Sequence, residues 1–430
     1  MKTYFLMLLA GVIISSCHSG TDSVNKADLT EKFQNNESIN YTRQRALEII
    51  KTGFNAGDGY REVWIRDYNT FIELAAEVYP AEELKENLLV FFRMQGADGN
   101  IIDGFTPRKD TIVKYDFSYS DLAPNYAGHK NTVETDQETS LIQAVYKYIK
   151  LTGDRSILNE KIGNRTVTER MEWALDFLMK NRLDNQYGLI WGATTADWGD
   201  VQPEHNWGVD LDENTHRAID IYDNAMFIIA LDNLMDMLPQ TETRWGMVRN
   251  QIFTNTRNYL WDESKHKFKP HIYLAGSPFP VDFNEDEIFY FGGSAIAIEA
   301  GLLSKDEIKA SINEMILRVK QAGAPSIGLT LYPVYPEGFF KNPGMTPFGY
   351  QNGGDWTWFG GRMIRQLIHY GFLKEAYEQL LPMTERVLKN KGFYEWYSVN
   401  NEPRGSGTFR GSAGVLYVAI EMLEAKLSEN

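Results

Sequence analysis

Apolar residues recur every three to four positions from about Tyr41 to the C-terminus, a spacing typical of amphipathic α-helices. Helix-ending residues such as Pro80, Gly153, Pro239 and Gly371 separate the periodic stretches. The pattern therefore predicts about twelve helices. They span Tyr41–Phe54, Trp64–Tyr79, Ala81–Gly96, Glu134–Thr152, Arg165–Arg182, Arg217–Leu238, Thr241–Leu260, Gly292–Leu303, Lys305–Ala322, Gly354–Tyr370, Leu373–Lys389 and Gly411–Ser428.

These helices form pairs, because a short connection follows one helix and a long loop follows the next. Six such hairpins predict an all-α fold, a closed (α/α)6 barrel, with strands only as short aromatic pieces such as Phe268–Leu274. An open helical solenoid is the alternative, but no fixed-period repeat supports it. We expect the long loops to gather at one end, where binding sites are usually built. They are Gly96–Thr132, Leu183–His216, Trp261–Phe291, Gly323–Gly353 and Gly392–Arg410.

The first seventeen residues have the composition of an export signal. A short cationic start precedes an apolar run from Tyr4 to Ile14, which is too short to span a bilayer. Ile14-Ser15-Ser16-Cys17 resembles a bacterial lipobox, which implies cleavage before Cys17 and lipid attachment to its thiol. An ordinary signal peptide with an incidental cysteine is the alternative. We therefore predict a lipoprotein signal peptide over 1–17, a flexible polar tether over 18–36, and a single domain over 37–430, anchored by lipid at the bacterial cell envelope.

Composition excludes several classes of function. The 430 residues include 43 Lys and Arg against 58 Asp and Glu, and the resulting net charge of −15 disfavours nucleic-acid binding. The single cysteine, Cys17, excludes a disulfide framework and a thiolate zinc cluster. The seven histidines are scattered, so we expect neither a metal nor a cofactor. Aromatic residues make up 13%, and although most of them must be core, their flat apolar faces suit sugar rings.

Chemistry-bearing residues gather in the predicted loops. The run Gly59–Asp67, which contains Arg61 and Trp64, leads into a helix with an Arg66-Asp67 pair. Such a pair can bind two neighbouring hydroxyls, the arginine donating and the aspartate accepting. A helix N-terminal carboxylate with a surface ion pair is an equally good interpretation of the spacing alone.

Two further loops offer carboxyl groups beside aromatic residues. In Gly188–Trp207, Asp197 and Asp200 flank Trp198, and packing against an indole raises a carboxyl pKa, as a general acid requires. An Asp-rich turn closed by backbone bonds is the structural alternative. In Phe393–Tyr397, Glu395 lies among four aromatic residues, and because burying a carboxylate there is costly, we predict that it serves as a base.

The run Gly349–Gly361 contains paired glycines that let the backbone approach a ligand closely. A packing motif at the start of a helix is the alternative for this segment. If it binds a ligand, its polar and aromatic residues Gln351, Asn352 and Trp356 are the ones that reach it.

Taken in order, these segments resemble the six-hairpin glycosidases, from about Tyr41 to the C-terminus. Gly59–Asp67 is similar to the first trehalase signature, and its Arg-Asp pair to that of glucoamylases and neutral invertases. Tyr350–Trp356 looks like the Tyr-His-Asn-Gly-Gly-Ser-Trp of neutral invertases, and Tyr394–Tyr397 resembles segments of both trehalases and invertases. Asp197–Asp200 is similar to the Asp-Trp-Asn-Asp of disaccharide phosphorylases. Processing α-glucosidases belong to the same group of inverting enzymes.

This resemblance implies an exo-acting, inverting glycoside hydrolase that acts on an α-linked small saccharide. It implies that Asp67 binds the sugar in subsite −1, Glu395 is the general base and Asp200 is the general acid. Asp197 stays a second candidate for the acid, because this loop differs from the trehalase version. The residues predicted to bind substrate are Arg61, Trp64, Arg66, Asp67, Trp198, Gln351, Asn352, Trp356 and Trp396.

Two rival functions remain open at this point. One is a uronide hydrolase or polysaccharide lyase on the same barrel, although a lyase needs a Tyr or His base with a cationic neutraliser rather than paired acids. The other is a carbohydrate-binding lipoprotein without activity. The sequence leaves the sugar and its linkage undetermined.

Overall fold

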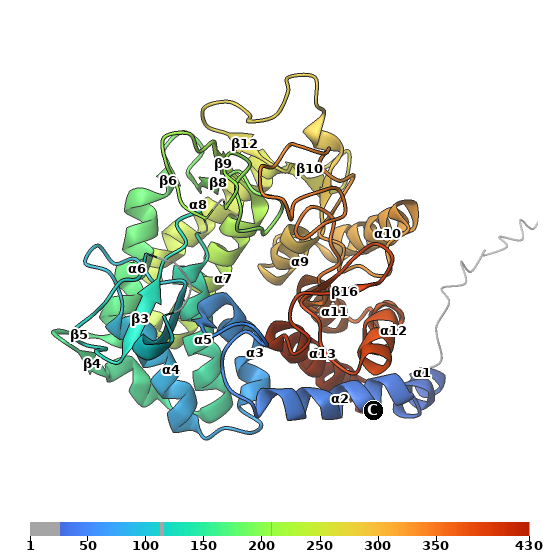
Figure 1. The fold of residues 1–430 in the computed structure, drawn as a ribbon, viewed down its shortest axis with the longest axis horizontal. Helices are drawn as coiled ribbons and strands as arrows, with labels where there is room; N and C mark the ends of the chain where they lie inside the picture. Colours follow the sequence, from blue (N-terminus) through green and yellow to red (C-terminus); the bar gives the residue numbers. More distant parts are fainter. Residues whose placement is uncertain (1–25, 112–115, 134, 208, 430) are drawn as a thin grey trace, which may run out of the picture.

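Six helices form a closed ring at the centre of the molecule (Figure 1). The computed structural model describes residues 26–429 except 112–115, 134 and 208. Each ring helix contacts the next, and the last one returns to the first. The predicted (α/α)6 barrel is therefore confirmed. The ring consists of α3 (Ile65–Ala75), α5 (Gln137–Thr152), α7 (Ile221–Met237), α9 (Phe291–Glu299), α11 (Thr357–His369) and α13 (Arg410–Ser428).

Six further helices surround the ring, one before each ring helix in the chain. Burial follows this division, because α7 is buried on all sides from Ile221 to Leu231, whereas α8 buries a single stripe. A helix that is apolar all round belongs inside, and one with a single apolar stripe lies outside. The outer helices are α2 (Glu37–Ile50), α4 (Ala81–Arg93), α6 (Val167–Asn181), α8 (Glu242–Leu260), α10 (Lys305–Ala322) and α12 (Leu373–Asn390).

The two ends of the barrel differ in the length of their connections. Ring helices lead into outer helices through connections that are mostly short, whereas the loops from outer to ring helices are long. All ring helices therefore begin at the long-loop end and direct the positive ends of their dipoles towards it. The long loops span residues 51–64, 94–136, 182–220, 261–290, 323–356 and 391–409.

Local capping chemistry sets several helix ends. Ser304 starts α10 and forms a capping box with Glu307, since each side chain bonds the other residue's backbone N–H. Gly323 ends α10 in the left-handed conformation, as Gly153 ends α5. One predicted helix boundary was wrong. The stretch Arg217–Ile219, at the start of a predicted helix, pairs as a strand instead.

Short strands stiffen the connections between the helices. A three-stranded sheet joins β1 (Val63–Trp64), β2 (Gly104–Pro107) and β3 (Tyr126–His129), and a second joins β8 (Gly192–Ala193), β9 (Arg217–Ile219) and β12 (Ile272–Tyr273). The remaining strands have two residues each. They are β4 (Lys161–Ile162), β5 (Arg165–Thr166), β6 (Leu183–Asp184), β7 (Leu189–Ile190), β10 (Trp261–Asp262), β11 (Lys267–Phe268), β13 (Phe289–Tyr290), β14 (Leu331–Tyr332), β15 (Trp396–Tyr397) and β16 (Pro403–Arg404).

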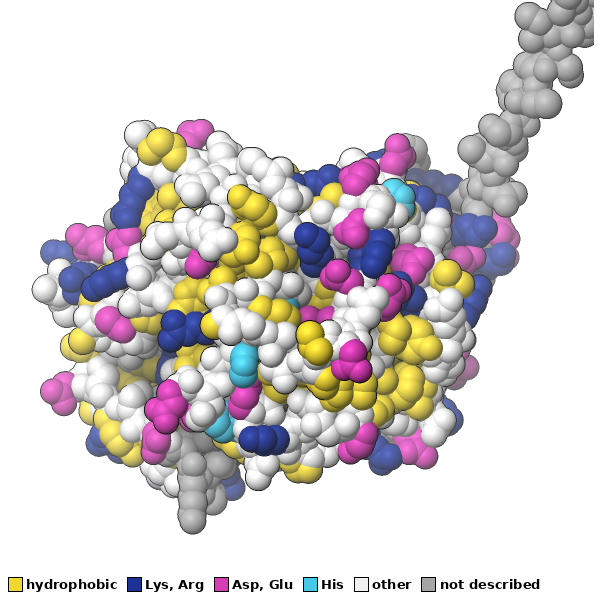
Figure 2. All heavy atoms as spheres, turned by 90° about the horizontal axis from the view of Figure 1, so that it is seen from above, with side chains coloured by type: hydrophobic (Ala, Val, Ile, Leu, Met, Phe, Trp, Pro, Cys, Tyr) yellow, Lys and Arg dark blue, Asp and Glu magenta, His cyan; other side chains and the backbone are white. Residues whose placement is uncertain are grey.

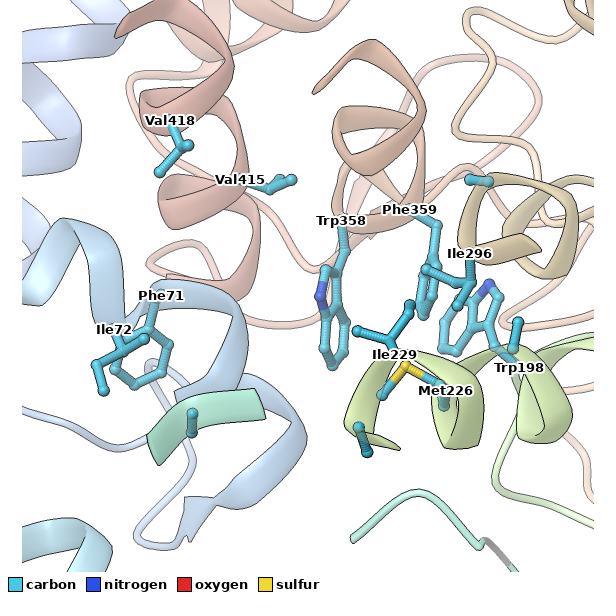
Figure 3. Packing of buried hydrophobic residues seen from close by; sticks show 14 of the residues in the cluster. Phe71, Ile72, Trp198, Met226, Ile229, Ile296, Trp358, Phe359, Val415 and Val418 are labelled. Atoms are coloured by element: carbon cyan, nitrogen blue, oxygen red, sulfur yellow. The ribbon is translucent and has the colours of Figure 1, made fainter. Parts of the chain in front are cut away.

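Aromatic side chains fill the barrel beneath the long loops. Figure 3 shows Trp358 and Phe359 of α11 beside Trp198, which comes from the loop before α7. The rings of Trp198 and Phe359 stack with centroids 4.3 Å apart and planes 18° apart. This packing fixes the loop that carries Asp197 and Asp200 to the barrel wall.

The N-terminal segment differs in part from the prediction. Residues Lys26–Gln34 form a helix, α1, whose Leu29 and Phe33 are buried, and the helix packs against α13. The prediction of a flexible tether is thus wrong for these residues. Cys17 and the predicted signal lie outside the described residues, so lipid attachment stays a prediction. Within residues 26–429, apart from the gaps named above, no helix combines the length and apolarity needed to cross a bilayer.

Charged side chains of both signs are interspersed on the surface seen in Figure 2. Many of them form ion pairs, such as Arg249 with Asp232 at 2.9 Å between the outer helix α8 and the ring helix α7. On this face, the net negative charge of the chain does not gather into one patch.

Candidate active site

A cavity of about 410 Å³ lies at the long-loop end of the barrel. Its size is that of a small-molecule binding site. The first turns of α3 and α11 form part of its wall, together with residues of five long loops. It is lined by Ala56, Tyr60, Trp64, Arg66, Asp67, Asp103, His129, Asn131, Trp198, Asp200, Val201, Trp207, Val209, Asn342, Gly344, Tyr350, Gln351, Trp356, Trp358, Glu395, Trp396 and Phe409.

Arg66 and Asp67 lie in the first turn of α3 and both reach the cavity. Arg66 Nε donates to Asp136 Oδ2 at 2.6 Å, and its Nη1 donates to the carbonyl of Trp198 at 3.4 Å. Asp67 is buried, and its Oδ1 has no hydrogen-bond partner among the described residues. Burial raises the pKa of Asp67 well above its usual range, and the charge of Arg66 opposes this shift. An unpaired carboxyl oxygen on a cavity wall can accept a hydrogen bond from a ligand hydroxyl.

Glu395 lies on the wall formed by the loop before α13. Its backbone N–H donates to the Ser406 carbonyl at 3.0 Å, and its Oε2 accepts from the Ser406 N–H at 3.3 Å. Its Oε1 accepts from the Tyr60 hydroxyl at 2.9 Å. Gly405 has φ of +67°, and a Cβ there would collide with the Glu395 carboxylate, so only glycine fits. The carboxylate is thus held from two sides.

Burial raises the pKa of Glu395, and the charge of Asp200 adds to the shift. The hydrogen bonds from Tyr60 and Ser406 act in the opposite direction. The electrostatic effect of Asp200 on Glu395 agrees with the finding that both carboxyl groups line one cavity. A general base with these partners loses activity as falling pH protonates it.

Asp200 is half-buried and forms a reciprocal pair with Gln351. Gln351 Nε2 donates to Asp200 Oδ1 at 2.6 Å, and the Asp200 N–H donates to Gln351 Oε1 at 3.2 Å. Gln351 lies in a tight turn in which Tyr350 has φ of +36°. Two loops far apart in the sequence therefore orient this carboxyl group together.

Asp197 occupies a different position, although it is only three residues away. Its Oδ1 and Oδ2 accept from the backbone N–H groups of Gly293 and Gly292, both at 2.7 Å, at the start of α9. It is 1% exposed and does not line the cavity. Burial raises the pKa of Asp197 to about 8, against the effect of these hydrogen bonds. Asp197 therefore fastens the loop to the start of α9 and does not close a local turn, which was the alternative considered for this segment.

Two predicted substrate-binding residues lie away from the cavity. Arg61 is not among the residues that line the cavity. Its side chain is 50% exposed, and its Nη1 lies 3.6 Å from Asp110 Oδ1. Asn352 is fully buried, where its Nδ2 donates to the carbonyls of Tyr335 and Met345. The structure therefore contradicts the placement of Arg61 and Asn352 in a sugar site. The other predicted substrate-binding residues line the cavity: Trp64, Arg66, Asp67, Trp198, Gln351, Trp356 and Trp396.

The cavity also contains residues that the sequence did not single out. Tyr60 belongs to the Gly59–Asp67 run and could have been found there. Asp103 and His129 reach the wall through paired strands, since the N–H of Asp103 donates to the carbonyl of His129 at 2.8 Å. Burial raises the pKa of Asp103 to about 7 and lowers that of His129 to about 4. No group of three or more His, Cys, Asp or Glu that could hold a metal occurs among the described residues.

Comparison with known proteins agrees with this architecture. Residues 27–324 match the glycosyl hydrolase 94 superfamily, catalytic domain. The chain belongs to this superfamily. The expected six-hairpin glycosidase family and a glycoside hydrolase enzyme are thereby confirmed. The sequence matches no curated protein.

Solved structures of other glycosidases share the fold of this glycosyl hydrolase 94 superfamily member. The mannosylglycerate hydrolase of Thermus thermophilus, solved with Tris and D-glycerate, aligns with a TM-score of 0.62 at 15% identity, over 88% of this chain and 99% of that one. A rhamnosidase from Klebsiella oxytoca, solved with rhamnose bound, aligns with a TM-score of 0.58 at 12% identity, over 90% of this chain and 64% of that one.

Proposed function

We propose that this glycoside hydrolase is exo-acting and inverting and cleaves an α-linked sugar from a small saccharide. The observation that carries the proposal is that Asp200 and Glu395, from loops nearly two hundred residues apart, line one cavity. An inverting enzyme needs an acid at the leaving oxygen and a base that activates water on the opposite face of the ring, with carboxyls about 6.5–9.5 Å apart. The likeness to a mannosylglycerate hydrolase and a rhamnosidase supports a sugar in this cavity.

Each role follows from the surroundings of its residue. Asp200 protonates the glycosidic oxygen, and Gln351 keeps its carboxyl group in place. Glu395 takes a proton from the attacking water, and Tyr60 and the Ser406 N–H orient it. Asp67 binds a hydroxyl of the sugar in subsite −1, since its Oδ1 lacks a partner among the described residues. Trp64, Trp356 and Trp396 wall the ring.

Water, rather than phosphate, is the proposed nucleophile. By the resemblance to disaccharide phosphorylases, Glu395 occupies the region where those enzymes admit phosphate, and a carboxylate there repels an anion. Arg66, the one cationic side chain among the described lining residues, already pairs with Asp136.

The stereochemistry of the product tests this mechanism. Purified protein is incubated with α-glucosides, α-mannosides and α-rhamnosides, and proton NMR follows the first product anomer. We expect the β-anomer of one free sugar to appear first, at a rate that inorganic phosphate does not change. First appearance of the α-anomer contradicts inversion. Formation of a sugar phosphate contradicts hydrolysis.

Removing the Tyr60 hydroxyl tests the environment of the base. The bond from Tyr60 lowers the pKa of Glu395, so Tyr60→Phe raises that pKa further. A base with a raised pKa stays protonated to higher pH, and the acidic limb of the kcat/KM profile is expected to move to higher pH. Tyr370→Phe, at the opposite end of the barrel, is the matched control. A uniform loss of rate without movement of the limb would assign Tyr60 a packing role only.

A further inference from the structure

Tyr335 is a fully buried tyrosine in the loop before α11, outside the set of residues that line the active-site cavity. Its backbone pairs with the side chain of Asn352. The Tyr335 N–H donates to Asn352 Oδ1 at 2.8 Å, and Asn352 Nδ2 donates to the Tyr335 carbonyl at 2.9 Å. Asn352 directly follows Gln351, whose side chain forms the reciprocal pair with Asp200. Tyr335 therefore fixes the turn that orients the proposed general acid.

The ring of Tyr335 also supports the loop that carries Asp200. Ala196 precedes Asp200 in this loop and Val201 follows it directly, and both flanking residues are buried. They form one hydrophobic cluster with Tyr335 and Tyr290. Protein interiors are close-packed, so the loop of Asp200 cannot shift without moving these two rings.

The tyrosine hydroxyls extend this support by hydrogen bonds. Tyr335 Oη donates to Glu285 Oε1 at 2.7 Å. The Tyr290 hydroxyl lies 2.6 Å from that of Tyr335 and 3.2 Å from the Thr195 carbonyl, and these two acceptors share its single proton. Thr195 Oγ1 in turn donates to the Asp197 carbonyl at 3.0 Å. A chain of hydrogen bonds therefore runs from Glu285 to the loop of the general acid.

Glu285 is a firmly held end of this chain. His271 Nδ1 lies 2.9 Å from Glu285 Oε1, and the Tyr273 hydroxyl donates to Glu285 Oε2 at 2.8 Å. Burial acts to raise the pKa of Glu285, but the nearby His271 and the hydrogen bonds that the carboxylate accepts outweigh burial and hold that pKa below its usual range. The charged acceptor strengthens the bond from the Tyr335 hydroxyl.

We propose that Tyr335 is a positioning residue for the general acid, holding the turn of Gln351 through its backbone and the loop of Asp200 through its ring and hydroxyl. The proposal rests on the proposed function, because Tyr335 acts on the reaction only through the position of Asp200. A catalytic group displaced by about 1 Å can lose about 10²-fold in rate, so the loss of part of this support should be measurable.

Leaving groups that differ in their need for a proton test this role. Fluoride leaves without a proton from the acid, so hydrolysis of an α-glucosyl, α-mannosyl or α-rhamnosyl fluoride identifies the accepted sugar. A disaccharide of that sugar needs the acid. Tyr335→Phe removes only the hydroxyl and keeps the ring and the backbone bonds to Asn352. We expect it to lower kcat/KM on the disaccharide by about tenfold and on the fluoride by less than about twofold.

Two further variants separate positioning from stability. Tyr148→Phe is the matched control, since the buried Tyr148 hydroxyl donates to Asp154 Oδ2 at 2.7 Å near the opposite end of the barrel. It should lower the melting temperature and leave the ratio of kcat/KM between disaccharide and fluoride unchanged. In the Asp200→Asn background, Tyr335→Phe should cause no further selective loss on the disaccharide, because a positioning residue acts through the acid.

Tyr290→Phe removes the other hydroxyl of the same pair and provides the same comparison if Tyr335→Phe folds poorly. Unchanged kinetics, equal losses on disaccharide and fluoride, or a selective loss that persists in Asp200→Asn overturns the inference while the proposed function stands. Failure of the wild type to release a sugar of inverted configuration from any of the fluorides overturns the proposed function itself.

Discussion

Glu395→Gln is expected to reduce kcat on the accepted disaccharide by about 10²–10⁴-fold and to leave thermal stability nearly unchanged. Glutamine keeps the size of the side chain. Its amide oxygen can accept from the Ser406 N–H, and its NH2 group can donate to the Tyr60 hydroxyl oxygen in place of the bond that Glu395 accepts. Glutamine cannot take a proton from water. The loss should therefore appear in kcat more than in KM. Steady-state kinetics and a thermal melt check the two halves of this expectation.

A matched control lies in the same loop. Glu402 is exposed and pairs with Arg404, outside the cavity, so Glu402→Gln should keep wild-type kinetics. Sodium azide adds a second readout, because this anion attacks the anomeric carbon without surrendering a proton. With Glu395→Gln, azide should yield a glycosyl azide of inverted configuration. Wild-type kcat in the variant, or a large fall in melting temperature as its only effect, would show that Glu395 is not the base.

The barrel could be predicted because the apolar pattern that marks each helix lies within that helix. Every ring and outer helix repeats apolar residues over several turns, so each helix is visible alone, and the alternation of connection lengths orders the helices into hairpins. The helix α1 escaped prediction because only Leu29 and Phe33 mark its apolar face. Two apolar residues in a polar stretch are too weak a pattern to predict a helix from the sequence. The helix is stabilised by packing against α13, which is distant in the sequence.

The site could be predicted only where its residues are contiguous. Arg66-Asp67 and Glu395 lie within compact runs that pair carboxyl groups with aromatic residues. Asp103 and His129 come from one long loop without such a run, and strand pairing brings them to the cavity. The pairing of β2 with β3 cannot be predicted from the pattern of residues in one sequence.

The sequence also could not predict which side chains of a run point into the cavity. Gln351 and Asn352 are neighbours in a tight turn, yet Gln351 reaches the cavity and Asn352 turns into the protein. Asp197 and Asp200 pose the same difficulty, because their spacing does not say which one faces the ligand. The left-handed conformation of Asp197, with φ of +55°, belongs to the turn that separates their directions.

Asp200→Asn distinguishes the two aspartates by the leaving group. An acid catalyst is needed when the leaving oxygen must gain a proton, but fluoride leaves without one. Asp200→Asn is therefore expected to lower kcat/KM on the disaccharide by about 10²–10⁴-fold and to leave hydrolysis of the α-glycosyl fluoride within a few-fold of wild type. Asparagine can still bond Gln351, so the turn should keep its shape.

Asp197→Asn is the matched comparison, because it makes the same chemical change three residues away. The two carboxylate oxygens of Asp197 accept hydrogen bonds from the N–H groups of Gly292 and Gly293, whereas asparagine has only one oxygen to accept them. A lower melting temperature is expected, with disaccharide and fluoride hydrolysis affected equally, since the residue acts on the loop and not on the leaving group. If instead Asp197→Asn shows the selective loss on disaccharide, the proton comes from Asp197. If neither variant discriminates between the two substrates, the acid lies elsewhere in the cavity, and Asp103, whose pKa burial raises to about 7, is the group to replace next.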